Sequence, residues 1–589
     1  MKQGCPVSGL LFILVIELFS IKIRVNPAIE GIIIRNETFK QLSYADDLEN
    51  FLRNIDSIKL TLRELELFGR VSGLHCNIGK CEAMALGDSP MEHIQYAGEE
   101  IKWVDEMTIT GITFTKNEND NRELNFEKAI EKLRTQLNIW KQRDLSLVGK
   151  IQIIKTFGIS QIQYIMNMVT PTTEMLKTIK KLLNNFLWGS NVNKIKHTTM
   201  IAEYDKGGLK MPDVESILYA QRLMWARRYF STEHRPWKVF FEWQFEKIGG
   251  LSVFQNTSIA IKEITKMPLM SFYESIIIAW AKCYDIPMDL ENFKKQVLYF
   301  NKNIVAPSGR TLFYPDLYEK QLISINDVIL DRRLITPAEM KIAKNLTGIE
   351  FLHYTSVYTC LKRIPNLAHL LQNAPLNCII HSTKSQMFGE NSKSLYRKLC
   401  EKITEIPSSE NKLSEMLAFD PDKFKNIYRL PFLVTIETKL RAFQFKISHL
   451  IFYTNEMLFE RKMVDSPLCT FCQAHTETLI HLFVSCSYVK PLWLSMENML
   501  DYSFSEAEKL LGCFSTMKNK KFDVLSHIAI LLKYYVHICR INNQKPSPKV
   551  LKRRILYSQF IESEIAKKRN KMDNHDLKWS SFLQNFSSQ

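Results

Sequence analysis

Two adjacent aspartates, Asp46 and Asp47, separate two short runs that favour β-strands, FKQLSY at 39–44 and LENFLR at 48–53. A tight hairpin usually carries Asn-Gly or Asp-Gly at its turn. A second Asp adds electrostatic repulsion there, which is tolerated most easily where a cation binds. We therefore expect two antiparallel strands joined through residues 45–47, with both carboxylates projecting from the tip of the hairpin.

An acidic hairpin of this kind has two interpretations. Hard divalent ions such as Mg²⁺ take oxygen ligands and commonly use one or two carboxylates together with substrate phosphates. Phosphoryl-transfer enzymes place two such ions close together at the reacting phosphate. A solvated acidic turn is the alternative, and the neighbouring sequence has to decide between the two.

The overall charge of the chain is strongly positive. At 589 residues it is too long for one hydrophobic core, so we expect several domains. The formal net charge of +16 suits binding to a polyanion such as nucleic acid, or to an anionic membrane surface. A merely soluble basic protein is the alternative. The 12 cysteines are scattered, which indicates reduced thiols in an intracellular compartment.

The apolar run GLLFILVIELF at 9–19 is similar in composition to a signal peptide. Glu17 interrupts the run, no small-residue cleavage site follows it, and Lys22 and Arg24 lie just beyond. The run is also too short to span a bilayer. We therefore expect a buried helix here, a protein that is not secreted, and no membrane-spanning segment elsewhere in the chain.

The pattern along the chain predicts an α+β fold. Short β-rich runs and a helix that stops at Gly73 come first, and basic amphipathic helices follow. We divide the sequence into five parts. They are a mixed segment (1–116), a basic helical segment (117–234), a mostly helical connecting region (235–425), a Cys/His module (426–500) and a basic helical tail (501–589).

Cys469, Cys472, His481 and Cys486 follow the spacing C-x2-C-x8-H-x4-C. The two-residue gap lets both thiolates reach one ion, and four such ligands form a closed tetrahedral Zn²⁺ site that is structural rather than catalytic. Buried free cysteines beside a surface histidine are the alternative. His475 is a second candidate for the nitrogen ligand, ranked lower because its closeness to Cys472 would strain the loop.

Four blocks follow one another in compact order: QGCPVSGLLF at 3–12, SYADDLENFL at 43–52, SGLHCNIGKCEAMALG at 72–87 and TITGITF at 108–114. Together they resemble the palm of the reverse transcriptases of LINE-type (non-LTR, L1-like) retrotransposons. In that family the blocks are a Gln-Gly helix, a Tyr-Ala-Asp-Asp hairpin, a lysine-bearing segment and the primer-grip hairpin. The resemblance implies an incomplete right-hand polymerase palm, built from short antiparallel strands and helices, followed by a largely helical thumb.

The resemblance also implies roles for individual residues. Gln3 and Gly4 would face the template and the incoming nucleotide, because glycine permits a close approach of the backbone. Tyr44 would pack under the primer end or the nucleotide. Asp46 would be a ligand of catalytic Mg²⁺, and Asp47 would be its partner in the acidic pair.

Lys80 completes the catalytic set implied by the resemblance. It would lie near the nucleotide phosphates and stabilise the departing pyrophosphate, a role that needs a cation. A plain surface lysine is the alternative. The implied partners are an RNA template, a DNA primer and dNTP, with no membrane.

Residues 137–164 resemble the thumb of the same family, with its Trp, Leu-Ser and Gly-Lys landmarks. Residues 438–458 and 465–472 are similar to the approach to its C-terminal zinc-finger module. The basic residues that we expect to bind nucleic acid in the thumb are Lys141, Arg143, Lys150 and Lys155.

The active site of this family uses a further Asp on a strand that precedes the Gln-Gly helix, where this sequence starts. We therefore expect an RNA-directed DNA polymerase that lacks the fingers and the first catalytic Asp and is inactive alone. The alternative is a catalytically dead remnant that binds RNA or DNA through the thumb and the zinc module. The expected location is the nucleus and cytoplasm, and the sequence indicates no oligomeric state.

Overall fold

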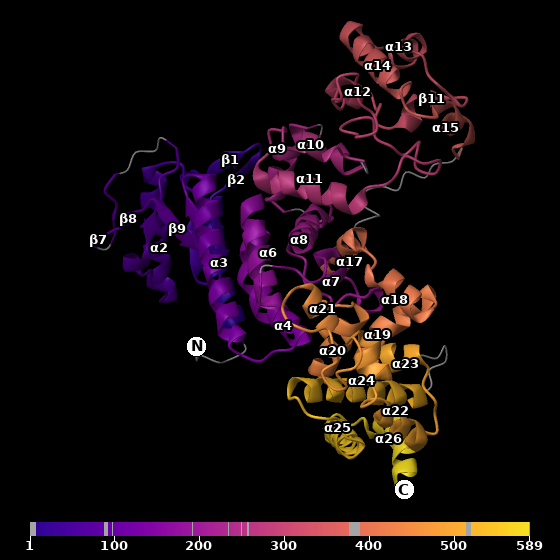
Figure 1. The fold of residues 1–589 in the computed structure, drawn as a ribbon. Helices are drawn as coiled ribbons and strands as arrows, with labels where there is room; N and C mark the ends of the chain where they lie inside the picture. Colours follow the sequence, from indigo (N-terminus) through magenta and orange to yellow (C-terminus); the bar gives the residue numbers. More distant parts are fainter. Residues whose placement is uncertain are drawn as a thin grey trace. The chain divides into compact units, whose positions relative to one another are not determined.

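The computed structural model describes residues 7–587, apart from 88–91, 97, 191, 234, 249, 256–257, 376–388 and 514–519. The described chain is mostly helical, with short two-stranded sheets (Figure 1). It forms two compact units. Unit 1 comprises Met1–Glu131, Ile162–Met175 and Glu215–Leu399, and unit 2 comprises Lys132–Gln161, Leu176–Val214 and Cys400–Gln589. The five-part division of the sequence stays a prediction.

The N-terminal part of unit 1 mixes helices and strands, as the sequence predicts. Its first core packs Phe19, Ile23 and Ile29 against Leu48 and Leu52. The elements are α1 (Ser8–Val25), β1 (Ile32–Ile34), β2 (Glu37–Phe39), β3 (Gln41–Tyr44), β4 (Asp47–Asn50), α2 (Ile55–Ser72), the 3₁₀-helix η1 (Ile78–Lys80), β5 (Glu82–Ala83), β6 (Gln95–Tyr96), β7 (Glu99–Glu100), β8 (Lys102–Trp103), β9 (Glu106–Ile109) and β10 (Ile112–Thr115).

The acidic hairpin is tighter than the sequence predicts. β3 and β4 pair antiparallel with Tyr44 opposite Asp47, so the loop consists of Ala45 and Asp46 alone. Asp47 therefore belongs to β4, and its placement in the connection is wrong. Ala45 adopts a φ of 54°, in the left-handed region that a two-residue reversal requires at its first position. This conformation favours glycine, so the hairpin holds an alanine in a conformation that is unfavourable for a residue with a side chain.

Helix α2 begins and ends at residues whose chemistry explains its bounds. The Asn54 side chain accepts a hydrogen bond from the backbone N–H of Ser57 at 2.8 Å, which satisfies a free donor of the first turn. Gly73 follows the helix with a φ of 73°, a conformation that glycine adopts readily. The predicted stop at Gly73 is confirmed.

A second hairpin, β9–β10, carries the Thr-Gly pair. Thr110 and Gly111 form its two-residue loop with φ values of 47° and 84°, the pattern of a type I′ turn. The hydroxyl of Tyr164, on α5 (Ile159–Met168), donates a hydrogen bond of 2.6 Å to the carbonyl oxygen of Thr110. This contact fixes the turn against a helix of the same unit.

Buried Arg222 joins three helices in the remainder of unit 1. Its Nη1 donates to the carbonyl oxygen of Asn167 at 3.0 Å, and its Nε donates to Ser275 Oγ at 2.8 Å. The elements here are α8 (Val214–Tyr229), α9 (Lys238–Glu246), the 3₁₀-helix η4 (Gly250–Gln255), α10 (Ile261–Ile264), α11 (Ser271–Tyr284), α12 (Pro315–Glu319), the 3₁₀-helix η5 (Ile325–Val328), β11 (Ile329–Leu330), β12 (Arg333–Leu334), α13 (Pro337–Lys344), α14 (Gly348–Leu361) and α15 (Leu367–Asn373).

The regular elements of unit 2 are helices among its described residues, joined by loops and by a β-bridge between Leu468 and Thr476. Of the helices that the structure describes, five contribute residues to both units, namely α3 (Glu118–Lys141), α5, α6 (Thr173–Trp188), α8 and α17 (Ser392–Ile403). The other elements are α4 (Leu147–Ile153), the π-helix η2 (Ile154–Gly158), α7 (His197–Met200), the 3₁₀-helix η3 (Tyr204–Lys206), α18 (Ser409–Leu417), the 3₁₀-helix η6 (Pro421–Lys423), α19 (Phe424–Val434), α20 (Thr438–Ser448), α21 (Asn455–Glu460), the π-helix η7 (His481–Ser485), α22 (Lys490–Leu500), α23 (Glu506–Leu511), α24 (Lys520–Ile541), α25 (Pro548–Lys568) and α26 (Met572–Ser587).

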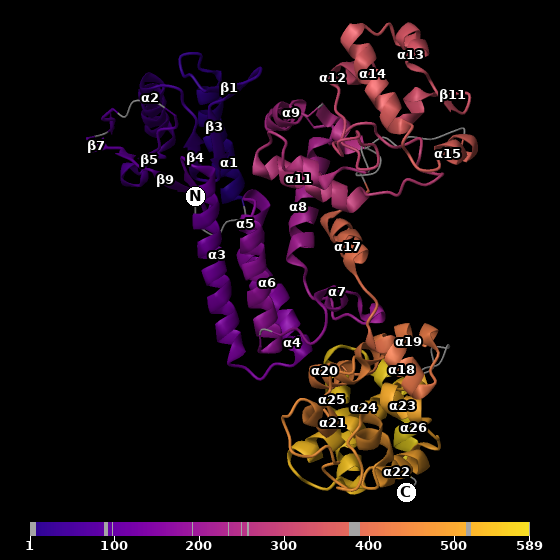
Figure 2. The same ribbon diagram turned by 45° about the horizontal axis from the view of Figure 1, so that its top comes forward.

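Helix α24 forms the centre of unit 2, in contact with α20, α25 and α26 (Figure 2). By length and composition its segment Phe522–Ile541 could cross a membrane, with a mean hydropathy of 1.3, a candidate that the sequence analysis overlooked. However, 72% of that segment is buried inside the protein. Trp493, Trp579 and Leu551 belong to the same core cluster, so the apolar character of α24 is explained by core packing.

Candidate metal centre

Three cysteines and one histidine of unit 2 converge on one point. The ligand atoms of Cys469, Cys472, His481 and Cys486 all lie within 4.8 Å of one another. The Sγ atoms of Cys469 and Cys486 are 3.8 Å apart, and Cys472 Sγ is 3.3 Å from His481 Nε2. Among the described residues, these four form the group of three or more Cys, His, Asp or Glu side chains that could hold a metal ion.

The backbone conformation of residues 481–486 explains how the side chains of His481 and Cys486, separated by four residues, point to the same side of the chain. Residues His481–Ser485 form a π-helical turn, and the Cys486 N–H donates to the His481 carbonyl oxygen at 2.9 Å. In an ordinary α-helix, residues five apart point in different directions, whereas the wider π-turn aligns them. Cys486 then leaves the helix with a ψ of 136°.

A second set of backbone hydrogen bonds shapes the loop around the first two cysteines. The Cys469 N–H donates to the His475 carbonyl oxygen at 2.8 Å, and the Gln473 N–H donates to the Cys469 carbonyl oxygen at 3.0 Å. Gln473 has a φ of 54°, so the chain reverses directly after Cys472. This tight reversal turns both thiols toward the same point.

The donor set fits a structural zinc ion. Three sulfur atoms and one imidazole nitrogen make up one of the closed tetrahedral sets that Zn²⁺ prefers. Burial, with the neighbouring His475, lowers the pKa of His481, which favours the neutral imidazole that a metal requires. His475 itself is exposed and lies outside the group, with its ring centroid 5.4 Å from that of His481.

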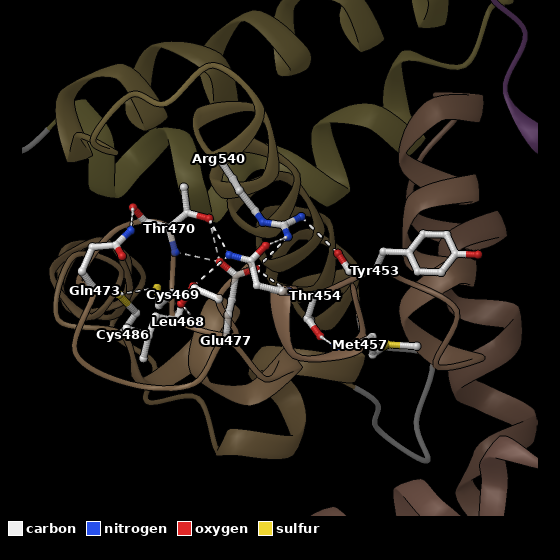
Figure 3. Close-up of polar contacts among 12 residues, drawn as sticks. Tyr453, Thr454, Met457, Leu468, Cys469, Thr470, Gln473, Glu477, Cys486 and Arg540 are labelled. Atoms are coloured by element: carbon white, nitrogen blue, oxygen red, sulfur yellow. Dashed lines mark hydrogen bonds and ion pairs between the residues drawn. The ribbon is translucent and has the colours of Figure 1, made fainter. Parts of the chain in front are cut away.

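A buried carboxylate, Glu477, holds the loop of the metal centre to the rest of unit 2 (Figure 3). Its Oε2 accepts hydrogen bonds of 2.9 Å from both the N–H and the hydroxyl of Thr470. Its Oε1 accepts from the Asn455 N–H at 3.0 Å and forms an ion pair of 2.7 Å with Arg540 of α24. Arg540 also donates to the Tyr453 carbonyl oxygen at 3.1 Å.

Sequence reasoning missed Glu477 and Arg540. Glu477 lies between the second cysteine and the histidine of the motif. An acidic residue at such a loop position gives no sequence signal of a structural role. The complete burial of Glu477 and its four polar contacts with Thr470, Asn455 and Arg540 show that it organises the loop instead. Arg540 lies far along the sequence, and no local pattern connects it to the motif.

The acidic hairpin of unit 1 presents a more open arrangement. Asp46 and Asp47 are both exposed, and Tyr44 is 71% exposed. Glu49, two residues along the same strand and on the same face as Asp47, has a pKa raised by burial and by repulsion from Asp47. The hairpin therefore carries a third carboxylate close to the predicted pair, which the sequence analysis did not single out.

Of the other residues predicted in the palm, the structure describes Lys80 but not Gln3 and Gly4. Lys80 ends the 3₁₀-helix η1 and is exposed. Two thiols flank this short helix, Cys76 and Cys81, with their Sγ atoms 3.2 Å apart. Gln3 and Gly4 lie outside the described residues.

The four basic residues predicted in the thumb fall into two environments. Lys141 and Arg143, at the end of α3, are exposed. Lys150 and Lys155 are half-buried. Burial, followed by the charges of Lys141 and Lys194, lowers the pKa of Lys150. Burial, followed by the charge of Lys210, likewise lowers the pKa of Lys155.

Comparison with known proteins places this metal centre in a family. Residues 392–493 match the family described as zinc-binding in reverse transcriptase, and all four clustered ligands lie within that range. The uncharacterized 149 kDa protein of transposon TX1 from Xenopus laevis is 21% identical over 96% of this chain and 47% of its own length. The chain therefore spans about half the length of that relative. Together, these two similarities support a relation between this chain and the C-terminal region of a non-LTR retrotransposon reverse transcriptase.

Proposed function

We propose that this chain is part of an RNA-directed DNA polymerase of a non-LTR retrotransposon, acting by two-metal nucleotidyl transfer on an RNA template, a DNA primer and dNTP. The observation that carries the proposal is the Cys₃His group, which assembles within the segment that matches the zinc-binding family of reverse transcriptases. The four blocks of unit 1 occur in the order of the polymerase palm, and the similarity to the transposon TX1 protein extends over 96% of the chain.

In this proposal the acidic hairpin contributes to a magnesium site. Asp46 and Asp47 supply carboxylate oxygens, the ligand type that Mg²⁺ prefers, and substrate phosphates supply others. Bound Mg²⁺ would activate the attacking oxygen and neutralise charge on the phosphates. The tight β3–β4 loop fixes the backbone position of Asp46, between Ala45 and the first residue of β4. Glu49 of β4, which is repelled by Asp47, adds a third carboxylate to the hairpin that carries Asp46 and Asp47.

The expectation that the N-terminal helix is buried is wrong, because only Phe19, Ser20 and Ile23 of α1 are buried. The exposed apolar face of α1 is consistent with a place in a larger polymerase. Leu10, Leu14 and Leu18 are each 65% exposed along one side of that helix. Contiguous apolar surface of this kind usually marks an interface with another part of a protein.

The Cys₃His group has a structural role in this proposal. A closed set of four protein ligands leaves no open position for a substrate. Zinc bound there would hold the loop of Cys469 and Cys472 to the π-turn that bears His481 and Cys486. The module would then support the surrounding basic surface, where RNA or DNA phosphates bind.

A second candidate function is a nucleic-acid-binding protein without polymerase activity. The net charge of +16 and the basic helices of unit 2 favour it, because neither depends on a complete active site.

The test measures binding and primer extension on one preparation of the chain. Binding of a fluorescent RNA and Mg²⁺-dependent extension of an annealed DNA primer are compared for the natural sequence and for Asp46→Asn. Extension that Asp46→Asn abolishes, with binding unchanged, supports the polymerase. Binding without extension in both proteins supports the second candidate over a polymerase that is active as this chain alone, and the absence of both contradicts each proposal.

A further inference from the structure

Unit 2 contains a cavity of about 710 Å³ between the start of α4 and helices α20 and α24. Residues from segments that are far apart in the sequence line it: some within 144–150, 439–458 and 534–541, together with Leu187, Trp188 and Lys194. Its volume lies within the range of about 300–1,000 Å³ that is typical of ligand-binding sites. The cavity is separate from the Cys₃His group, none of whose members lines it.

The charged side chains of the cavity are mainly cationic. Two of its basic residues are neutralised, because Lys439 pairs with Asp144 at 2.8 Å and Arg540 pairs with Glu477 at 2.7 Å. The remaining three are Lys150, Lys194 and Lys446.

These three ammonium groups have no ion pair with a carboxylate among the described residues. Lys150 Nζ donates only to the Leu187 carbonyl oxygen, at 3.3 Å, and Lys194 Nζ lies 4.8 Å from the ring centroid of Tyr453. Desolvation, and then repulsion from Lys194 and Lys150, lowers the pKa of Lys446. Positive charges that repel one another in a partly desolvated site are stabilised when an anion binds between them.

The rest of the cavity wall is aromatic and apolar. Phe443, Phe452, Tyr453, Tyr534 and Trp188 all line it. Sites that bind single-stranded nucleic acid combine basic side chains for the phosphates with aromatic rings for the bases. Inorganic phosphate would leave this aromatic wall without a partner, and an acidic peptide has no planar ring that matches it.

We propose that this cavity binds one nucleotide of single-stranded nucleic acid, with its phosphate at Lys150, Lys194 and Lys446 and its base or sugar against the aromatic wall. This inference rests on the proposed function to the extent that the chain binds nucleic acid. A single strand is required because the bases of a duplex are stacked inside the helix and cannot enter a side cavity.

The test is the binding of a short fluorescent uridine oligonucleotide to the full chain over a range of salt concentrations. Lys446→Gln and Lys194→Gln remove one cavity charge each, and Lys425→Gln is the control because Lys425 is an exposed lysine of α19 that does not line the cavity. Each cavity variant should weaken binding about tenfold, as expected for a charge-assisted hydrogen bond. Each should also flatten the slope of log affinity against log salt by about 0.7.

Competition distinguishes the class of ligand, with uridine monophosphate, inorganic phosphate and a polyglutamate peptide as competitors. We expect the nucleotide to compete better than phosphate and the peptide to compete poorly. Equal competition by all three would overturn the assignment to a nucleotide. Trp188→Leu should weaken oligonucleotide binding but leave the salt slope unchanged, because it removes an aromatic contact and no charge.

The two proposals fail in different ways. If the natural chain binds RNA and both cavity variants bind like Lys425→Gln, the inference is wrong and nucleic-acid binding stands. If the natural chain binds no RNA, both proposals are wrong. One zinc ion per chain in every variant would show that the substitutions have left the Cys₃His module folded.

Discussion

Arg540 of α24 forms an ion pair of 2.7 Å with Glu477, whose side chain is completely buried between the two halves of the Cys₃His motif. The same guanidinium donates to the Tyr453 carbonyl oxygen, and Tyr453 lines the basic cavity. Within unit 2, one arginine therefore links the candidate zinc centre, the core helix and the candidate nucleotide site.

The Glu477–Arg540 pair should contribute strongly to stability. Glu477→Ala leaves a largely buried arginine without its partner, so we expect the free energy of unfolding to fall by about 3–5 kcal/mol. The measurement is chemical denaturation of the full chain. Glu564→Ala is the matched control, since it breaks the exposed pair between Lys567 and Glu564 at the same distance of 2.7 Å, and its cost should stay below about 1 kcal/mol. Equal effects of the two substitutions would contradict the role given to Glu477.

Zinc should be bound by the four clustered residues and not by His475. Cys469→Ser and His481→Ala should each remove zinc from the purified chain and lower its melting temperature, because metal binding at such a site is folding free energy. His475→Ala should retain one zinc ion per chain. Metal analysis by mass spectrometry checks both statements, and loss of zinc in His475→Ala alone would show that the ligand assignment is wrong.

The buried Lys533 should make stability depend on pH. Burial lowers the pKa of Lys533 to about 7, whereas a lysine of the unfolded chain titrates near about 10.4. Between these values the unfolded state binds one more proton than the folded state, so stability rises with pH in this window. The slope from this group is at most about 1.4 kcal/mol per pH unit.

Lys533→Met tests this assignment. We expect the free energy of unfolding to rise more steeply with pH for the natural sequence than for the variant. The measurement covers about pH 7 to 9, which lies between the two pKa values of Lys533. The comparison removes the contributions of titrating groups that do not interact with Lys533, and a Cys513→Ser background removes the thiol that does. Parallel curves would show that Lys533 keeps an ordinary pKa.

The type I′ turn of β9–β10 should accept a more favourable residue. Thr110 is β-branched and has a φ of 47°, a conformation that such residues rarely adopt. Thr110→Asn creates the Asn-Gly pair preferred in this turn, so we expect a gain in stability of about 0.5–1 kcal/mol. The hydrogen bond from Tyr164 to the backbone carbonyl at this position does not depend on the side chain. A loss of stability on thermal denaturation would show that the Thr110 hydroxyl matters more than the backbone conformation.

Local sequence was sufficient for several features of the fold. The stop of α2 at Gly73 and the strands around the two aspartates were predicted, because turn residues and alternating patterns act over a few positions. The hairpin of residues 108–114 was expected only from the family resemblance. The position of Asp47 was missed by one residue. The local sequence does not indicate that Ala45 adopts the left-handed conformation that shortens the loop.

The sequence by itself determined the chemistry of this protein. The spacing of three cysteines and one histidine, the paired aspartates and the excess of lysine and arginine are all readable from the residues alone. Only the tertiary structure decided which groups meet. Glu477 and Arg540 lie 63 positions apart, and the lysines of the cavity come from segments between residues 144 and 541. Such contacts depend on long-range packing around α24, whose burial brings these segments together, and no local pattern encodes that.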